Sequence, residues 1–229
     1  MEGEAAITTV LFDAGGTLVH LDYRFLHREL HRAGIPVTRT MVRRAECASR
    51  LAVDRRMLAA VPDTDETRRH PYFAALLAQL GIDPEAAAPL IARFDAAHAQ
   101  DNLWRVMPRE TRRVLAGLRE RGLTLGVISN SDGRIAAVLE QCGIAQFFDV
   151  VIDSHDVGVE KPNPRIFHLA LEQAGARPEE AIFVGDIYSI DILGAERAGM
   201  RPVLIDALGC YAEGKCEKIR HLRELLFIV

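Results

Sequence analysis

One acidic residue of the sequence, Asp13, follows directly on an apolar run and precedes a glycine-rich turn. The run at residues 7–12 is rich in β-branched and aromatic side chains, a pattern typical of a buried strand. Gly15, Gly16 and Thr17 come next, and glycines let a backbone pass close to a ligand. Because ligands of open α/β sheets bind beyond the carboxyl ends of the strands, we expect Asp13 to lie where such a fold carries out chemistry.

Polar residues occupy comparable positions in three later parts of the sequence. Ser129 closes the apolar run 123–129 and Asn130 follows it. Asp186 closes the run 181–185, and Asp191 comes five residues later. Lys161 lies in a proline-containing loop between these two runs. If the strands are parallel, their ends share one rim, so these side chains are candidates for a single site.

The pattern from residue 105 onward predicts the elements that position this site. Helical periodicity at 109–121, 133–142, 164–175 and about 190–199 alternates with strand-like runs at 123–129, 147–152, 181–185 and 202–205. We expect Asp132 to cap the helix that begins at Gly133. This alternation requires parallel strands joined by right-handed crossovers. The sequence therefore predicts an α/β fold with a doubly wound parallel sheet.

Residues 22–103 carry helical patterns and no strand signal. Thr38 is expected to begin one helix, Thr64 or Asp65 caps another after a turn at 62–65, and Pro84 opens a further one. A helical block placed after the first strand predicts a separate small domain at residues 20–104. The α/β core domain would then comprise residues 1–19 and 105–229.

Composition and charge restrict the class of partner. The formal net charge is −4 and there is no long run of Lys or Arg, so neither nucleic acid nor an anionic membrane is favoured. No apolar run approaches the ~20 residues needed to span a bilayer. The start of the chain lacks the features of a secretory signal, and the four cysteines are scattered. We expect four reduced thiols in a cytoplasmic protein. Oligomeric state is not indicated.

The four polar positions, in this order, resemble the motifs of the haloacid dehalogenase-like (HAD) hydrolase superfamily. That family has Asp-x-Asp-Gly-Thr, then Ser or Thr at a strand end, then Lys, then Gly-Asp-x-x-x-x-Asp. The matching stretches here are residues 13–17, Ser129, Lys161 and residues 185–191. The resemblance implies a Rossmann-like core, with residues 20–104 as a helical cap over the site.

The resemblance also implies roles for these residues. Asp13 would be the nucleophile, and Mg²⁺ would be held by Asp13, the main-chain carbonyl of Gly15 and Asp186. Asp191 would hold the metal-bound waters or join the metal ligands. The residues implied to bind or stabilise the phosphoryl group are Gly16, Thr17, Ser129, Asn130 and Lys161. The expected activity is Mg²⁺-dependent hydrolysis of a small phosphorylated metabolite through an aspartyl-phosphate.

Gly15 departs from the family pattern, because most phosphatases of the family have a second Asp there as general acid and base. His20 and Asp22 are candidates to replace it, although each also suits a hinge or surface position. Two alternatives therefore remain open. One is a dehalogenase-type hydrolase that attacks carbon, and the other is a non-catalytic phosphate-binding member. A phosphonatase is not expected, because residues 20–104 contain no lysine to form a Schiff base.

Overall fold

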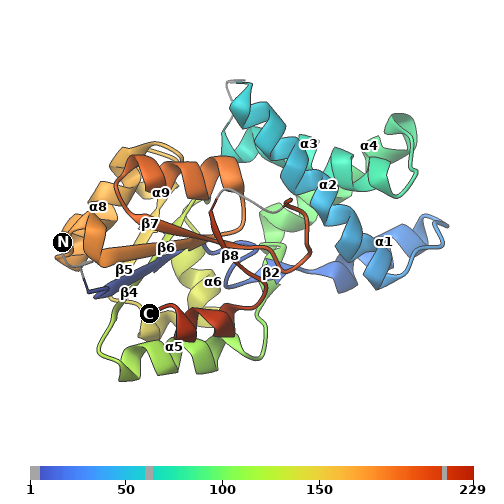
Figure 1. The fold of residues 1–229 in the computed structure, drawn as a ribbon. Coiled ribbons are helices and arrows are strands. Elements are labelled where there is room, and N and C mark those ends of the chain that lie inside the picture. Colours follow the sequence, from blue (N-terminus) through green and yellow to red (C-terminus); the bar gives the residue numbers. More distant parts are fainter. Residues whose placement is uncertain (1–5, 60–63, 213–215) are drawn as a thin grey trace.

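A six-stranded sheet forms the centre of the computed structural model, which describes residues 6–59, 64–212 and 216–229 (Figure 1). All its neighbouring strands pair in parallel. In spatial order the strands are β5 (Val150–Asp153), β4 (Thr124–Ser129), β1 (Thr9–Phe12), β6 (Ala181–Gly185), β7 (Arg201–Ile205) and β8 (Glu217–Ile219). The order places β1 in the interior of the sheet, and the predicted α/β fold with a doubly wound parallel sheet is confirmed.

Alternate residues of β1 enter two different cores. Val10 and Phe12 pack with α5 (Thr111–Glu120), α6 (Ile135–Gln141) and η4 (Leu222–Phe227). Leu11 packs on the opposite face with α8 (Pro164–Ala174) and α9 (Leu193–Arg197). In Figure 1, α8 and α9 lie on one side of the sheet and α5 lies on the other. Both faces of the sheet are covered, and β1 is buried along its whole length, as expected of a central parallel strand.

Several boundaries differ from the predicted ones. The strand expected at 147–152 begins only at Val150, because residues 145–147 form the 3₁₀-helix η1 (Ala145–Phe147) and Phe147 packs against the core from there. The helix expected from about 190 begins as the π-helix η3 (Tyr188–Ile192) and continues as α9. Strand β8 was not predicted, because three residues are too short for a periodic signal. The expected turn at 62–65 lies partly outside the described residues.

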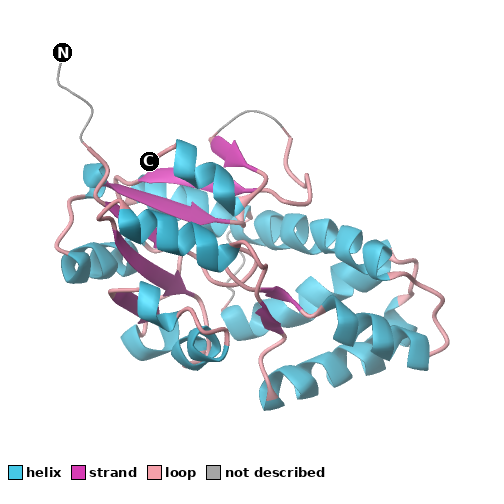
Figure 2. Ribbon diagram, turned by 90° about the horizontal axis from the view of Figure 1, so that it is seen from below, coloured by secondary structure: helices cyan, strands magenta, loops and turns pink. Residues whose placement is uncertain are grey.

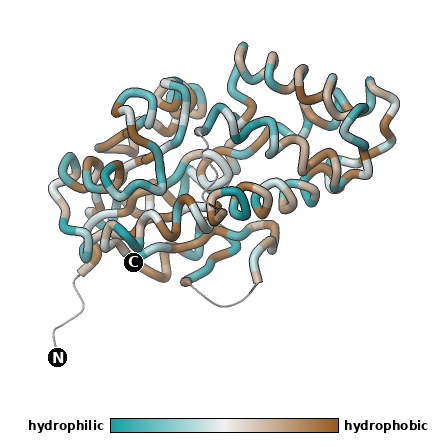
Figure 3. Tube along the Cα trace, turned by 90° about the horizontal axis from the view of Figure 1, so that it is seen from above, coloured by the Kyte–Doolittle hydropathy of each residue, from teal (hydrophilic) through white to brown (hydrophobic). Residues whose placement is uncertain are grey.

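Four helices form what we call the helical block: α1 (Tyr23–Arg32), α2 (Arg39–Leu58), α3 (Asp65–Gln79) and α4 (Pro84–Gln100). They lie together at one end of the molecule, away from the sheet (Figure 2). Both hydrophobic and hydrophilic stretches occur along these helices (Figure 3), and the block has its own core around Phe73 and Phe94. Thr38 and Thr64 cap α2 and α3, as predicted. That the block is a separate domain remains a prediction.

Two short strands connect the block to the sheet. Strand β2 (His20–Leu21) pairs antiparallel with β3 (Trp104–Val106), so the two connecting segments lie side by side. The sequence pattern did not reveal them, because each is too short to show alternation. Asp22 caps α1 by accepting hydrogen bonds from two backbone N–H groups, and its carboxylate lies 3.0 Å from Nη2 of Arg105. Asp22 therefore has structural partners on both connections.

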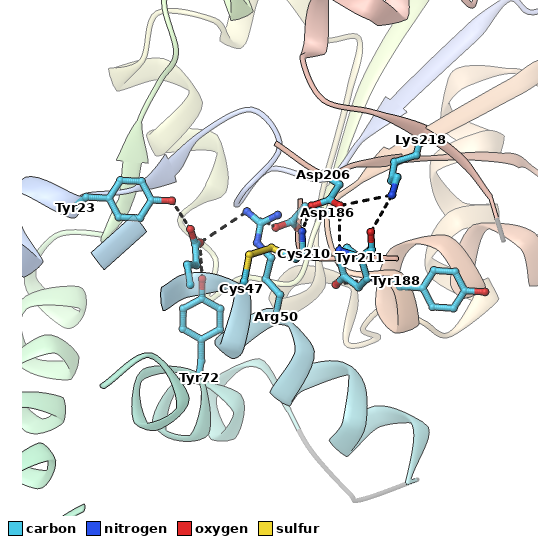
Figure 4. The surroundings of a disulfide bond; sticks show 11 residues. Tyr23, Cys47, Arg50, Tyr72, Asp186, Tyr188, Asp206, Cys210, Tyr211 and Lys218 are labelled. Carbon is cyan, nitrogen blue, oxygen red and sulfur yellow. Dashed lines mark hydrogen bonds and ion pairs between the residues drawn. A yellow bond between two sulfur atoms is a disulfide. The ribbon is translucent and has the colours of Figure 1, made fainter. Parts of the chain in front are cut away.

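The cysteine prediction was wrong for one pair. Cys47 of α2 and Cys210, in the connection after β7, form a disulfide that joins the helical block to the core (Figure 4). The two residues are 163 positions apart, so their approach depends on how α2 packs against the sheet. Cys142 and Cys216 are free. The described residues include no helix long and apolar enough to cross a membrane. The cytoplasmic location remains a prediction.

Candidate active site

Three carboxylates from different elements meet at the carboxyl ends of the central strands. Asp13 follows β1, Asp186 follows β6, and Asp191 lies on η3. All three are buried, and one oxygen of each lies within 4.8 Å of the others. The parallel pairing of β1 with β6 brings the first two acids together, as the strand-end argument predicted.

Lys161 lies among these carboxylates. Its Nζ donates to Oδ1 of Asp13 at 2.7 Å and to Oδ1 of Asp191 at 2.8 Å. Burial opposes the charge of Lys161, but the two carboxylates outweigh this effect and raise its pKa. Asn130 fixes the backbone of the lysine, because its Oδ1 accepts from Lys161 N at 2.8 Å and its Nδ2 donates to Lys161 O at 2.9 Å. The side chain of Asn130 is therefore a positioning group.

Asp191 fixes the turn that follows β6. Its Oδ2 accepts hydrogen bonds from the backbone N–H groups of Asp186 at 3.1 Å and Ile187 at 3.0 Å. A Cβ atom on Gly185 would lie 2.3 Å from the Cβ of Asp191, which no real structure tolerates. The glycine and the second acid of the Gly-Asp-x-x-x-x-Asp motif therefore depend on each other for packing.

The donor set fits a hard divalent cation such as Mg²⁺. Oδ2 of Asp13 is buried and has no hydrogen-bond partner. Burial raises the pKa of Asp13 to about 6, against the effect of Lys161, and raises the pKa of Asp186 well above its usual range. Buried carboxylates so close together require positive charge to stay ionised. Carboxylate oxygens are the ligands that Mg²⁺ prefers, so Asp13 and Asp186 suit the role predicted for them.

The two glycines of the first motif are explained by different neighbours. Gly16 has φ +92°, and a Cβ there would lie 2.1 Å from Oδ2 of Asp186. Only glycine combines that backbone conformation with this close approach. A Cβ on Gly15 would lie 3.3 Å from Cδ1 of Trp104, a contact that needs only a small shift. Gly15 is therefore the position of the two that could accept a side chain.

Arg50 of α2 was not predicted, although it reaches the site. Its guanidinium Nη2 lies 3.1 Å from Oδ2 of Asp186 (Figure 4). Both side chains are buried. Glu46, one turn earlier, accepts from the hydroxyl groups of Tyr23 and Tyr72 and lies 3.8 Å from Arg50. The sequence signal that could have indicated Arg50 is its position on the same face of α2 as Val53 and next to Ser49, both of which are buried.

A cavity of about 130 Å³ lies between the carboxylates and the helical block. It is lined by most of the predicted site residues: Asp13, Gly15, Ser129, Asn130, Lys161, Asp186 and Asp191. Side chains of the block complete it, among them Asp65, Arg69 and His98. Tyr72 and Trp104 also line it, whereas Phe73 is fully buried in the core of the helical block.

Four other residues singled out in the sequence lie elsewhere or have different partners. Thr17 and His20 line a second cavity, of about 290 Å³, and Gly16 N–H donates to Val19 O. Burial lowers the pKa of His20 to about 4. Asp132 does not cap α6, because its carboxylate binds the guanidinium of Arg134 instead. The predicted roles of Gly16 and Thr17 in substrate binding remain predictions.

Two known proteins are similar to more than half of this chain. Glyceraldehyde 3-phosphate phosphatase from Methanopyrus kandleri is 41% identical over 142 residues, which cover 59% of this chain and 59% of that protein. Haloacid dehalogenase-like hydrolase domain-containing protein 3 from Bos taurus is 38% identical over 128 residues, covering 56% and 51%. The chain thus spans about half the length of the curated relatives it matches.

A solved structure and a family model extend the likeness over more of the chain. The crystal structure of a HAD phosphatase from Thermococcus onnurineus has 25% identity and a TM-score of 0.60, and the match covers 97% of both chains. The family model described as haloacid dehalogenase-like hydrolase matches residues 7–199. These residues include the first strand, the helical block and all four motifs, and the chain therefore belongs to the haloacid dehalogenase-like hydrolases.

Proposed function

We propose that this chain is a Mg²⁺-dependent phosphohydrolase of a small phosphorylated metabolite, with Asp13 as the nucleophile. One observation carries the proposal. Lys161 holds Oδ1 of Asp13, while Oδ2 of the same carboxylate is buried without a partner among two further acids. A carboxylate fixed at one oxygen and free at the other, beside a cation, suits attack on an electrophilic phosphorus.

The proposed reaction has two steps. An Asp13 oxygen forms a bond to phosphorus as the bond from phosphorus to the leaving oxygen breaks, and that oxygen takes a proton. Water then attacks the phosphorus of the aspartyl-phosphate, releases inorganic phosphate and regenerates Asp13. Ser129, the backbone N–H of Asn130 and Lys161 would bind the phosphoryl oxygens and neutralise their charge.

The predicted metal ligands are Asp13, Asp186 and the main-chain carbonyl of Gly15. A bound Mg²⁺ would stabilise the charge on the phosphoryl oxygens. Asp191 orients Lys161 and the backbone of Asp186 through the hydrogen bonds described above. Arg50 adds a second buried cation beside Asp186, which lowers the cost of holding three carboxylates in one site.

The size and position of the cavity support a small substrate. A volume of about 130 Å³ suits a metabolite and not a macromolecule. Two of the similar proteins, a glyceraldehyde 3-phosphate phosphatase and a HAD phosphatase, are named for action on phosphorylated compounds, which supports a phosphorylated substrate here. We propose that the helical block is the cap, residues 20–104, that covers this compound, and that β2 and β3 are its two connections.

The test is release of inorganic phosphate from a panel of phosphorylated metabolites and aryl phosphates, with Mg²⁺ and with a chelator. We expect turnover that requires Mg²⁺. A parallel assay measures chloride release from 2-chloropropionate with the chelator present. Chloride release without phosphate release would overturn the proposal in favour of a dehalogenase. Binding of Mg²⁺ or phosphate with no turnover of any compound would show a non-catalytic member.

A further inference from the structure

The proposed reaction needs a group that gives a proton to the leaving oxygen, and Gly15 has none to give. We propose that Asp65, the first residue of α3 in the helical block, is this general acid and the general base of the second step. This inference rests on the proposed phosphohydrolase function. It assigns to the block a proton transfer that the core of the chain, with glycine at position 15, does not supply.

The first turn of α3 is attached to the loop that carries the catalytic lysine. The backbone N–H of Asp65 donates to Oε1 of Glu160 at 3.1 Å, and Nη2 of Arg68 lies 2.6 Å from Oε2 of the same carboxylate. Glu160 directly precedes Lys161, which contacts Asp13. These contacts hold Asp65 at the edge of the reaction site whenever the block lies against the core.

The side chain of Asp65 is open to the cavity. It lines the same cavity as Asp13, and it is 35% exposed, whereas the neighbouring Arg68 is 7% exposed. Its carboxylate lies 3.9 Å from Arg68, which is too long for a hydrogen bond. Asp65 therefore combines a fixed backbone with a carboxyl group that can reach a bound molecule.

The surroundings of Asp65 bring the pKa of its carboxyl group close to neutral pH, where the group can both donate and accept a proton. Partial desolvation at the wall of the cavity raises the pKa of Asp65 to about 6. Arg68 and Arg69 lower this pKa, and Glu160 and Asp132 raise it. A general acid works best when its pKa lies near the working pH, because it must donate in one step and accept in the next.

Among the described residues, the other titratable side chains that the helical block and nearby loops contribute to the cavity are poorly suited to donate a proton near neutral pH. The hydroxyl of Tyr72 donates to Glu46, and its pKa is raised well above the usual range by burial. Burial lowers the pKa of His98 to about 4, so it holds no extra proton at neutral pH. Asp132 binds Arg134, which lowers its pKa and keeps it ionised. Asp65 is the remaining donor outside the carboxylates around Lys161.

Asp65 donates one proton in the first step and regains one in the second. As the bond from phosphorus to the leaving oxygen breaks, the carboxyl of Asp65 transfers its proton to that oxygen and becomes a carboxylate. In the second step this carboxylate takes a proton from the water that attacks the aspartyl-phosphate. Asp65 ends protonated, inorganic phosphate is released, and no further reactant is consumed.

The test is the dependence of rate on the pKa of the leaving group, measured with a series of aryl and alkyl phosphates. We expect Asp65→Asn to slow alkyl phosphates by ~10²–10⁴-fold and to spare 4-nitrophenyl phosphate, which needs no acid. The plot of log rate against leaving-group pKa should become steeper than in wild type. Asp65→Glu should keep part of the alkyl rate.

Asp132→Asn is the matched control, because it removes a carboxylate from the same cavity and leaves Asp65 in place. It lowers the pKa of Asp65 by removing a neighbouring negative charge, but the slope should change far less than in Asp65→Asn. Gly15→Asp in the Asp65→Asn background should restore alkyl phosphates selectively. An unchanged slope in Asp65→Asn would overturn the role of Asp65. If 4-nitrophenyl phosphate is still hydrolysed in that experiment, the proposed phosphohydrolase function stands. An equal loss for all substrates would also overturn the proposed role of Asp65, because it shows a positioning role. A folded wild type that hydrolyses no phosphate overturns both proposals.

Discussion

Arg50 of the helical block and Asp186 of the core form a buried ion pair, with 3.1 Å between Nη2 and Oδ2. The same helix, α2, contacts the core at two further places. Asp54 Oδ1 accepts from the backbone N–H of Ser189 at 2.7 Å, and Cys47 forms the disulfide with Cys210. A single helix thus joins the block to the turn that carries the second predicted metal ligand, so its position and the charge balance of the site are linked.

Removal of Arg50 should destabilise the metal-free protein and increase its response to Mg²⁺. Arg50→Met leaves the carboxylate of Asp186 buried with one fewer cation, a change that costs about 3–5 kcal/mol when one partner of a buried pair is lost. Mg²⁺ would then compensate the charge, so its stabilising effect should be larger in the variant than in wild type. Urea unfolding with chelator and with Mg²⁺ measures both effects.

The matched control for this variant is Arg44→Met, on the exposed side of the same helix. It removes the same charge and leaves Asp186 paired, so we expect a change within about 0.5 kcal/mol. Equal losses in the two variants, or an equal response to Mg²⁺, would contradict the link between Arg50 and the metal site.

Asp13→Asn should abolish turnover and leave the fold intact. The two side chains have nearly the same shape, but an amide is a poor nucleophile, so the rate should fall by at least ~10³-fold. Phosphate release and the melting temperature are measured on the same preparation. Asp132→Asn, the same substitution elsewhere in the cavity, serves as the control. Substantial turnover by folded Asp13→Asn would remove this residue from its role.

Two of the four cysteines should be unreactive until the protein is reduced. A thiol reagent added to the denatured, unreduced chain should detect two thiols, those of Cys142 and Cys216, and four after reduction. Cys47→Ser should lower the free energy of unfolding by about 2–4 kcal/mol and speed hydrogen exchange in α2. Four reactive thiols without reduction would show that the disulfide does not form in solution.

His20 should make the protein more sensitive to acid. Its pKa is lowered to about 4 in the folded chain, against 6.5 for an ordinary histidine. Between these values the unfolded chain binds a proton that the folded chain does not, so stability falls as pH drops from 6.5 towards 4. Between pH 7 and pH 4.5, the free energy of unfolding of His20→Gln should fall by roughly 2 kcal/mol less than that of wild type. Parallel stability curves would rule this out.

Much of the core could be read from short stretches of sequence. The apolar run before Asp13 and the run before Asp186 each identify a buried strand and the residue at its end. Parallel pairing then brings the ends to one rim, where both acids lie. The helix caps Thr38 and Thr64 could also be predicted, because a helix cap depends only on residues three or four positions away.

Elements without a local signal were missed or misplaced. Strands β2, β3 and β8 have two or three residues each, too few for periodicity to be recognised. Asp132 has the type and position of a helix cap, but Arg134 competes successfully for its carboxylate. The short strands depend on pairing with distant segments, whereas Asp132 is taken by a guanidinium only two residues away, which the helix-cap pattern does not consider.

The sequence by itself determined the order of the longer strands and helices, the four motifs and therefore the family. Those features are local, because side-chain type and spacing within one element set which face is buried and where the element ends. Only the tertiary structure decided that Arg50 lies beside Asp186, that Cys47 meets Cys210, and that Asp65 shares a cavity with Asp13. Each of these contacts joins the helical block to the core. Their distances depend on how the helical block packs against the sheet and its loops, which no pattern within a single helix or strand specifies.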